Sequence, residues 1–176
     1  MTVPTIRPAH EADMERLVDV EVKAGQLFHT VGMSQVAEDV PDRSDLREAI
    51  ERAQVWVAQF GAEIAAYITA EVLDGNAHVA QVSVAPAYAG RRIGRALLEF
   101  VEAWGRDAGL PATTLTTFRD VPWNGPYYLR LGYRVLASNH VGPELARAMA
   151  HEASLPGIDA SLRCAMIKPN HPPAVT

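Results

Sequence analysis

The chain has 176 residues, a length that fits one domain with a substantial hydrophobic core. Its formal net charge of -5 argues against a nucleic-acid partner, because such proteins usually carry a basic surface. No apolar run is long enough to span a membrane, and the first residues show no signal-peptide pattern. The single cysteine, Cys164, excludes an internal disulfide and suits a reducing compartment. We therefore expect one cytoplasmic domain over residues 1–176.

The first half of the chain reads as a short strand, two helices and a run of three strands. A loop or broken short helix separates the two helices, and Ser44 is the expected N-cap of the second. The Asp74–Gly75 dipeptide is typical of a tight hairpin, so the three strands predict an antiparallel meander. The expected ranges are 3–9, 10–28, 43–53, 54–60, 63–73 and 77–85.

The second half begins with a long amphipathic helix, which Gly109 and Pro111 end. Strands and short helices then alternate to the C-terminus. The expected ranges are 91–109, 112–118, 125–132, 133–137, 142–155 and 161–169. Together the elements predict a mixed α/β (α+β) fold, with a mostly antiparallel central sheet flanked by helices. Residues 168–176 read as a frayed tail.

Small and positively charged residues gather where the third meander strand leads into the long helix. The segment SVAPAYAGRRIGRALLEF holds Gly90, Arg91, Arg92, Gly94 and Arg95. A helix N-terminus presents unpaired N–H groups and the positive end of the helix dipole, and both favour phosphate. The glycines leave the backbone accessible, and arginine binds phosphate oxygens through several donors. We interpret the segment as a cradle for a diphosphate.

Two known phosphate motifs do not match this segment. A P-loop requires Gly-Lys-Ser/Thr, which is missing, and the G-x-x-x-G spacing after an antiparallel meander departs from the dinucleotide fingerprint. The plainer alternative is a helix start that contains two glycines and unrelated arginines.

The stretch VAPAYAGRRIGRALL resembles the coenzyme A-binding motif of the GNAT superfamily of N-acetyltransferases. In that motif a strand ending in V-x-P precedes Gln/Arg-x-x-Gly-x-Gly/Ala and a helix. Val84 and Pro86 match the end of the strand, and Gly94 matches the final glycine. Ala89 replaces the usual Gln or Arg, and Arg92 replaces the middle glycine. The main-chain cradle tolerates both changes, and Arg92 supplies charge that position 89 lacks.

A second block, NGPYYLRLGYRVL, resembles a later motif of the same family. Tyr127–Tyr128 fall on its aromatic pair, and Gly132–Tyr133 complete it. The two blocks and the strand between them have the spacing that the family shows. The resemblance is strong over residues 55–135 and extends to the rest of the chain through the order of its elements, which implies a GNAT-like fold.

The resemblance implies transfer of an acetyl group from acetyl-CoA to an amine by direct attack in a ternary complex. The acceptor is then a small molecule or an N-terminal or lysine amine, and another acyl-CoA donor is an alternative. An alternative from a different class is a coenzyme A-binding regulatory module without turnover. Dimers are common in the family, which makes a homodimer an option. No histidine or cysteine spacing indicates a metal site.

The resemblance also assigns residues to the cofactor site, by their positions in the two blocks. These residues are Val82, Ser83, Val84, Gly90, Arg91, Arg92, Ile93, Gly94, Arg95, Ala96, Asn124 and Tyr127. Within this set, a backbone N–H in residues 82–84 is expected to hold the thioester oxygen.

Three residues are candidates for proton transfer. Tyr128 is expected to act as general acid toward the coenzyme A sulfur, and its alternative role is a buried aromatic anchor. His78 titrates in a useful range for a base, with a solvent-exposed strand end as the alternative. Glu21 is a second possible base on the first long helix, with an exposed helix carboxylate as the alternative. A water-relayed path leaves the base open.

Overall fold

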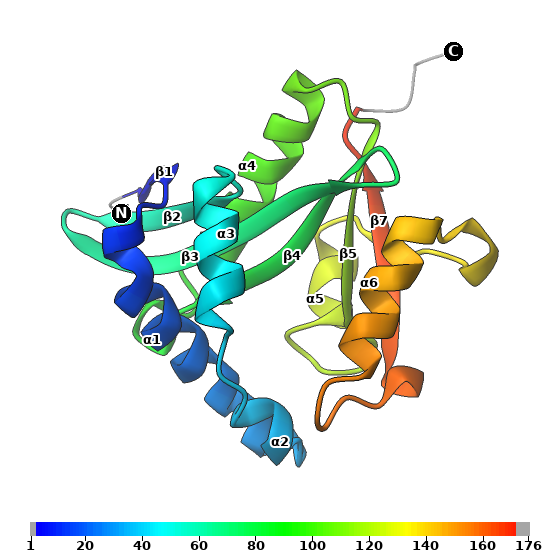
Figure 1. Cartoon of the computed structure of the whole chain (residues 1–176), viewed down its shortest axis with the longest axis horizontal. Coiled ribbons are helices and arrows are strands. Elements are labelled where there is room, and N and C mark those ends of the chain that lie inside the picture. Colours follow the sequence, from blue (N-terminus) through cyan, green and yellow to red (C-terminus); the bar gives the residue numbers. More distant parts are fainter. Residues whose placement is uncertain (1–2, 172–176) are drawn as a thin grey trace. The chain divides into compact units, whose positions relative to one another are not determined.

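A computed structural model describes residues 3–171 (Figure 1). Its seven-stranded sheet has the order β1-β2-β3-β4-β5-β7-β6. The strands are β1 (Thr5–Pro8), β2 (Val55–Phe60), β3 (Glu63–Leu73), β4 (Asn76–Val84), β5 (Ala112–Phe118), β6 (Arg134–Val135) and β7 (Arg163–Pro169). The helices are α1 (Met14–Gly25), α2 (Ser34–Ala37), α3 (Arg43–Glu51), α4 (Ile93–Asp107), α5 (Gly125–Arg130) and α6 (Pro143–Ala153).

The pairing directions confirm the predicted mixed, mostly antiparallel sheet. β1 with β2, β2 with β3, β5 with β7 and β6 with β7 are antiparallel pairs. β4 and β5 pair in parallel, with Ala77 opposite Thr113 and Val79 opposite Leu115. None of the helices in residues 3–171 is both long and apolar enough to cross a membrane.

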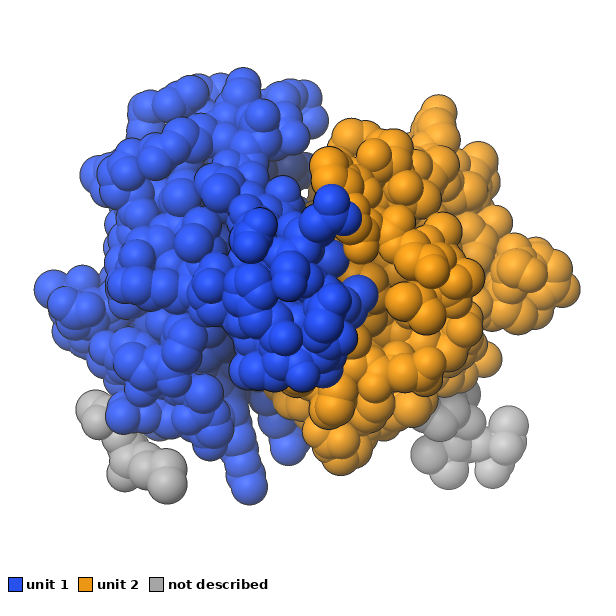
Figure 2. Space-filling view, turned by 90° about the horizontal axis from the view of Figure 1, so that it is seen from below, with its two compact units in different colours: residues 1–70, 81–99 blue, residues 71–80, 100–176 orange. Residues whose placement is uncertain are grey.

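The chain forms two compact units, which Figure 2 colours separately. The first contains the residues up to 70 together with 81–99, and the second contains 71–80 and the residues from 100 onward. β3, β4 and α4 each contribute residues to both units. The grouping of both units in one domain stays a prediction.

In the first unit, α1 and α3 bury their apolar faces against β2 and β3. α1 contributes Met14, Leu17 and Val18, whose spacing of three and four residues places them on one helix face. Leu46 of α3 and Val57 of β2 belong to the same core. Burial of each such large apolar side chain stabilises the fold by about 1.5–3 kcal/mol.

The expected N-cap of α3 was wrong by two residues. The cap is Asp42, whose carboxylate accepts hydrogen bonds from the N–H groups of Ser44 and Asp45, at 2.7 and 3.1 Å. Ser44 lies inside the first turn of the helix. An extended Asp42 with a charged acceptor is the better partner for these two amides.

In the second unit, α6 is attached to the sheet at both ends. At its N-terminus, the Asp74 carboxylate accepts hydrogen bonds from the N–H groups of Glu144 and Leu145, at 3.0 and 2.9 Å. Near its C-terminus, Glu152 accepts a hydrogen bond from Thr116 on β5 at 2.7 Å and pairs with Arg163 on β7 at 2.9 Å. These contacts fix both the axial position and the rotation of the helix.

The expected tail began too early. β7 continues to Pro169, and Asn170 is buried because its side chain bonds the carbonyl of Leu110 and the hydroxyl of Thr113, at 3.0 and 2.6 Å. The rest of the predicted tail, residues 172–176, lies outside the described residues. The strand predicted over 133–137 is shorter, because β6 covers only Arg134–Val135.

Asp74 provides a test of this anchoring. Asp74→Ala should lower the free energy of unfolding by about 1–2 kcal/mol, because two amides at the start of α6 lose a charged acceptor. Asp74→Asn should lose less, since asparagine also tolerates the left-handed φ of +49° at this position. Urea titration followed by circular dichroism measures both. Equal losses for these variants and for the exposed surface control Asp107→Ala would contradict the capping role.

Candidate active site

Backbone geometry at the β4–α4 junction leaves a row of amide groups open. Gly90 has a φ of +76° and Arg92 a φ of +60°, so the chain turns twice through the left-handed region before α4 begins. The first i to i−4 bond of the helix runs from the N–H of Ala96 to the Arg92 carbonyl, at 3.1 Å. Within residues 3–171, no side chain accepts a hydrogen bond from the N–H groups of Gly90 through Gly94. These donors remain available to a ligand.

The three arginines of the junction differ in their surroundings. Arg91 lies over the ring of Tyr88, 5.2 Å from its centroid, and Tyr88 stacks on Phe60 at 5.6 Å. Arg95 pairs with Glu99 at 2.7 Å. The side chain of Arg92 makes no ion pair or hydrogen bond within the described residues and is exposed. Arg92 is therefore the arginine whose charge is most available to an anion.

The left-handed conformation of Arg92 gives a physical reason for the glycine that the family pattern has at this position. A non-glycine residue in the left-handed region costs about 1–2 kcal/mol, because Cβ approaches the following carbonyl oxygen. Glycine avoids this cost, which accounts for its place in the pattern. In this chain the arginine keeps the left-handed conformation and adds a positive charge.

The end of β4 supplies the other cofactor residues predicted for the first unit. Ser83 is buried and accepts a hydrogen bond from the side chain of Gln81 at 2.8 Å. Its neighbours Val82 and Val84 are half-buried. The structure thus brings residues 82–84 and 90–96 together in one unit, along the same continuous segment.

Glu21 lies on the buried face of α1, one turn after Leu17, and the hydroxyl of Tyr67 on β3 donates a hydrogen bond to its Oε2. Burial raises the pKa of the Glu21 carboxyl to about 7, and the nearby carboxylate of Asp39 adds to this. The alternative of an exposed helix carboxylate was wrong. The reason is the helical period, which places position 21 on the same face as Leu17.

His78 is 1% exposed on β4, and its Nδ1 lies 3.0 Å from the Thr114 hydroxyl on β5. Burial lowers the pKa of this histidine to about 4, although the Glu152 carboxylate acts in the opposite direction. The imidazole is therefore neutral near pH 7 and a weak base. The alternative of a solvent-exposed strand end was wrong.

Tyr128 is buried on α5, with its ring packed edge-to-face against Tyr127 and Tyr133 at 5.4 and 5.9 Å. Its hydroxyl makes no hydrogen bond within residues 3–171. No fully buried polar side-chain atom of these residues lacks a partner, so this hydroxyl reaches solvent. Burial raises its pKa far above the usual value, and the phenol stays protonated.

The neighbouring Tyr133 is different, because its hydroxyl donates to Glu102 at 2.9 Å and Lys168 pairs with the same carboxylate at 2.8 Å. Asn124 is the residue before α5, and its carbonyl accepts a hydrogen bond from the N–H of Tyr128 at 3.0 Å. Tyr127 is half-buried beside Arg130, whose guanidinium is 6.0 Å from the ring centroid.

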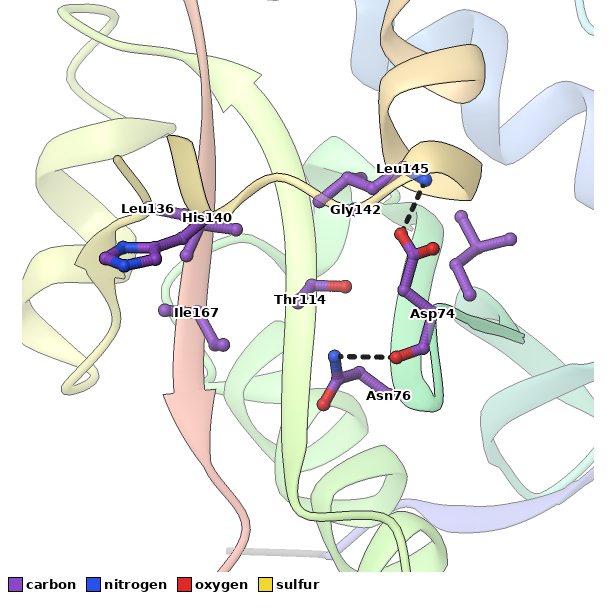
Figure 3. A pocket seen from close by; sticks show the side chains of 9 residues that line it. Asp74, Asn76, Thr114, Leu136, His140, Gly142, Leu145 and Ile167 are labelled. Carbon is purple, nitrogen blue, oxygen red and sulfur yellow. Dashed lines mark hydrogen bonds between the residues drawn. The ribbon is translucent and has the colours of Figure 1, made fainter. Parts of the chain in front are cut away.

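The second unit also contains a cavity of about 270 Å³ (Figure 3). Its lining residues are Leu73, Asp74, Asn76, Thr114, Leu136, His140, Gly142, Leu145 and Ile167. None of the predicted site residues is among them. Asp74 points from the β3–β4 turn toward the N-terminus of α6, so the carboxylate of this cavity already has protein partners (Figure 3).

Comparison with known proteins decides the family. Residues 26–133, more than half of the chain, match the family model described as acetyltransferase (GNAT) family. The chain belongs to the GNAT acetyltransferase family. Among the described residues of this GNAT protein, no group of three or more His, Cys, Asp or Glu side chains is placed to hold a metal ion.

Solved structures show the same fold at low sequence identity. The PaiA N-acetyltransferase from Thermoplasma acidophilum in complex with coenzyme A has a TM-score of 0.73 at 17% identity, over 96% of this chain and 99% of that one. The N-acetylglutamate synthase from Neisseria gonorrhoeae, complexed with coenzyme A and N-acetyl-glutamate, has a TM-score of 0.71 at 15% identity. The match covers 98% of this chain and 36% of that one. The ribosomal-protein-S18-alanine N-acetyltransferase from Escherichia coli has a TM-score of 0.66 at 14% identity, over 98% and 99%.

Sequence reasoning missed two residues near the candidate base, Tyr67 and Asp39. Tyr67 is the single tyrosine of an otherwise apolar strand segment, IAAYI, and a lone phenol in a buried strand is a usable signal. The contribution of Asp39 had no such signal, because its approach to Glu21 depends on the fold of the α2–α3 loop.

The left-handed conformation at the β4–α4 junction should make two arginine-to-glycine substitutions differ in their effect on stability. Arg92→Gly should raise the free energy of unfolding by up to about 1 kcal/mol, because glycine removes the left-handed strain at a smaller entropic cost. Arg95→Gly, three residues further and inside α4, should lower it by about 1 kcal/mol. Thermal unfolding of the two variants measures this contrast. A loss of stability in Arg92→Gly comparable to that in Arg95→Gly would argue against a strained junction.

Proposed function

We propose that this protein transfers an acetyl group from acetyl-CoA to an amine, which is a small molecule or an N-terminal or lysine amine. The observation that carries the proposal is the open row of N–H groups from Gly90 to Gly94. Unpaired amides at the start of a fifteen-residue helix suit a doubly charged diphosphate, which coenzyme A contains.

The junction has the space that such a ligand needs. A side-chain carbon at Gly90 would meet no atom within 4 Å, so a phosphate oxygen can reach this part of the backbone. The exposed Arg92 adds charge and hydrogen-bond donors at the same place. Two of the similar structures hold coenzyme A, which supports this choice of diphosphate.

In the proposed reaction, the amine nitrogen attacks the thioester carbon. The C–N bond forms, the C–S bond breaks, and the amine loses a proton because only its neutral form is nucleophilic. We assign this proton to the Glu21 carboxylate. A base with a pKa of about 7 is well matched to neutral pH, whereas His78, with a pKa of about 4, is a far weaker base.

The leaving thiolate needs a hydrogen-bond donor, and we assign this role to Tyr128. Its hydroxyl has no partner within the described residues and reaches solvent. Because burial holds the pKa of this phenol far above its usual value, donation of a hydrogen bond is favoured over complete proton transfer. The role rests on the position of Tyr128 in the second motif and on its unpaired hydroxyl.

Two observations bear on the acceptor. The segment AEDVPDRSDLREAIE, residues 37–51, is acidic and suits a cationic amine. The similar structures come from enzymes whose names give different acceptors, glutamate and the alanine of a ribosomal protein. The proposal therefore extends to amines as a class and not to one compound.

Coenzyme A binding and thiol release test this function in two stages. At about 100 times its dissociation constant, coenzyme A should stabilise the fold by roughly 2.7 kcal/mol in a thermal-shift assay. Arg92→Asp should weaken binding at least about tenfold, and Arg134→Asp, an exposed charge reversal on β6, should not. Release of free thiol from acetyl-CoA is then followed against a panel of primary amines. Binding without release for any amine would favour the regulatory module.

The pH dependence of turnover tests the base. The value of kcat/KM should rise with pH and level off above about pH 7, because Glu21 must lose its proton before it can accept another. Glu21→Gln should remove this rise and lower turnover by about 10²–10⁴-fold. His78→Gln should keep the rise. A profile that follows His78 instead of Glu21 would contradict the assignment.

Two neighbouring tyrosines form a matched pair for the donor role. Tyr128→Phe should cut kcat by about 10²- to 10³-fold, as expected for loss of a hydrogen-bond donor to the leaving thiolate. Coenzyme A affinity and stability should change little, because the Tyr128 hydroxyl has no hydrogen-bond partner within residues 3–171. Tyr133→Phe should cost about 1–3 kcal/mol of stability, since Glu102 loses a buried donor, and should spare kcat. Unchanged turnover in Tyr128→Phe would remove Tyr128 from the mechanism.

A further inference from the structure

A buried hydroxyl contacts the proposed base from the opposite side of the core. Tyr67 is 1% exposed on β3 and belongs to the core cluster that also contains Leu17 and Val20 of α1. Its one hydrogen bond goes from the hydroxyl to Oε2 of Glu21. A tyrosine hydroxyl left unpaired at this depth would cost about 1–3 kcal/mol, so the phenol and the carboxylate fix each other's position.

The second oxygen of the carboxylate is left open. Glu21 Oε1 makes no hydrogen bond within residues 3–171. Since no fully buried polar side-chain atom of these residues is without a partner, Oε1 reaches solvent. The Tyr67 contact therefore divides the carboxylate into one oxygen held by the protein and one oxygen available to an incoming proton.

Within residues 3–171, no cation pairs with Glu21 in place of Tyr67. The charged side chains nearest to Glu21 along α1 are engaged with one another, because Asp19 pairs with Arg16 at 2.6 Å and with Lys23 at 2.9 Å. The charged group that acts on Glu21 from outside α1 is the Asp39 carboxylate, which repels the ionised form. Among the described residues, the Tyr67 hydroxyl is therefore the donor that stabilises an ionised Glu21.

We infer that Tyr67 is a positioning residue for Glu21, which holds Oε2 by a hydrogen bond so that Oε1 faces the acceptor amine and takes its proton. The catalytic part of this inference rests on the proposed function. The hydrogen bond itself does not depend on any reaction, and its expected effect on the ionisation of Glu21 can be measured without turnover.

Tyr67→Phe tests the inference through pH. Loss of the donor should move the midpoint of the kcat/KM profile upward by about one pH unit, because the ionised carboxylate loses its hydrogen bond. At pH 7 kcat should fall about fivefold, because the ionised fraction of Glu21 drops from about one half to about one tenth, with the KM for acetyl-CoA unchanged. The matched control is Tyr133→Phe, which removes another buried tyrosine-to-glutamate hydrogen bond and should leave the midpoint in place.

A second readout needs no turnover. In the full-length protein labelled with ¹³C at the glutamate carboxyls, the Glu21 signal is identified by its loss in Glu21→Gln and is titrated in the wild type, Tyr67→Phe and Tyr133→Phe. An upward shift of the Glu21 midpoint in Tyr67→Phe alone supports the inference, even if no amine is acetylated. An unshifted midpoint in Tyr67→Phe, with a stability loss like that of Tyr133→Phe, overturns it.

Discussion

The backbone amides of Gly90 through Gly94, before and within the first turn of α4, are the feature on which the proposed cofactor site depends. The chain passes through the left-handed region at Gly90 and again at Arg92, and the Arg92 carbonyl accepts the i to i−4 bond from the N–H of Ala96. Five successive N–H groups, Gly90 through Gly94, thereby have no acceptor within residues 3–171, at the positive end of the longest helix of that range. A fold tolerates open donors and a strained arginine at one place when a ligand supplies the missing acceptors.

Two hydrogen-bonded pairs of tyrosine and glutamate differ in the charged groups that surround the carboxylate, and this difference separates a structural role from a chemical one. In the second unit, Glu102 accepts a hydrogen bond from Tyr133 and is also paired with Lys168. In the first unit, Glu21 accepts one from Tyr67 and has the carboxylate of Asp39 nearby instead of a cation. The first arrangement links three side chains of the second unit and fixes their positions. The second keeps a carboxyl near its titration midpoint at neutral pH, which is the property a general base requires.

The sequence predicted the fold well because its signals were local. Strand alternation, the Asp74–Gly75 hairpin and the helix-ending Gly109 each depend on a few adjacent residues, and the two family blocks placed the β4–α4 junction and α5. The predictions from sequence failed where contacts between residues far apart in the chain determine the burial of a side chain. Asn170 is held by Leu110 and Thr113, which no local pattern at the C-terminus reveals. Likewise, the burial of His78 and the meeting of Glu21 with Tyr67 depend on packing between elements far apart in the chain.

The most direct measurement is amide mapping by ¹⁵N–¹H NMR during titration of the protein with coenzyme A. The largest shifts are expected on the backbone amides of Gly90 through Gly94, and these amides should move downfield as hydrogen bonds to phosphate form. Desulfo-coenzyme A, which keeps the diphosphate, should give the same pattern. Shifts that cluster on other segments while these five amides stay in place would contradict the cradle and the function built on it.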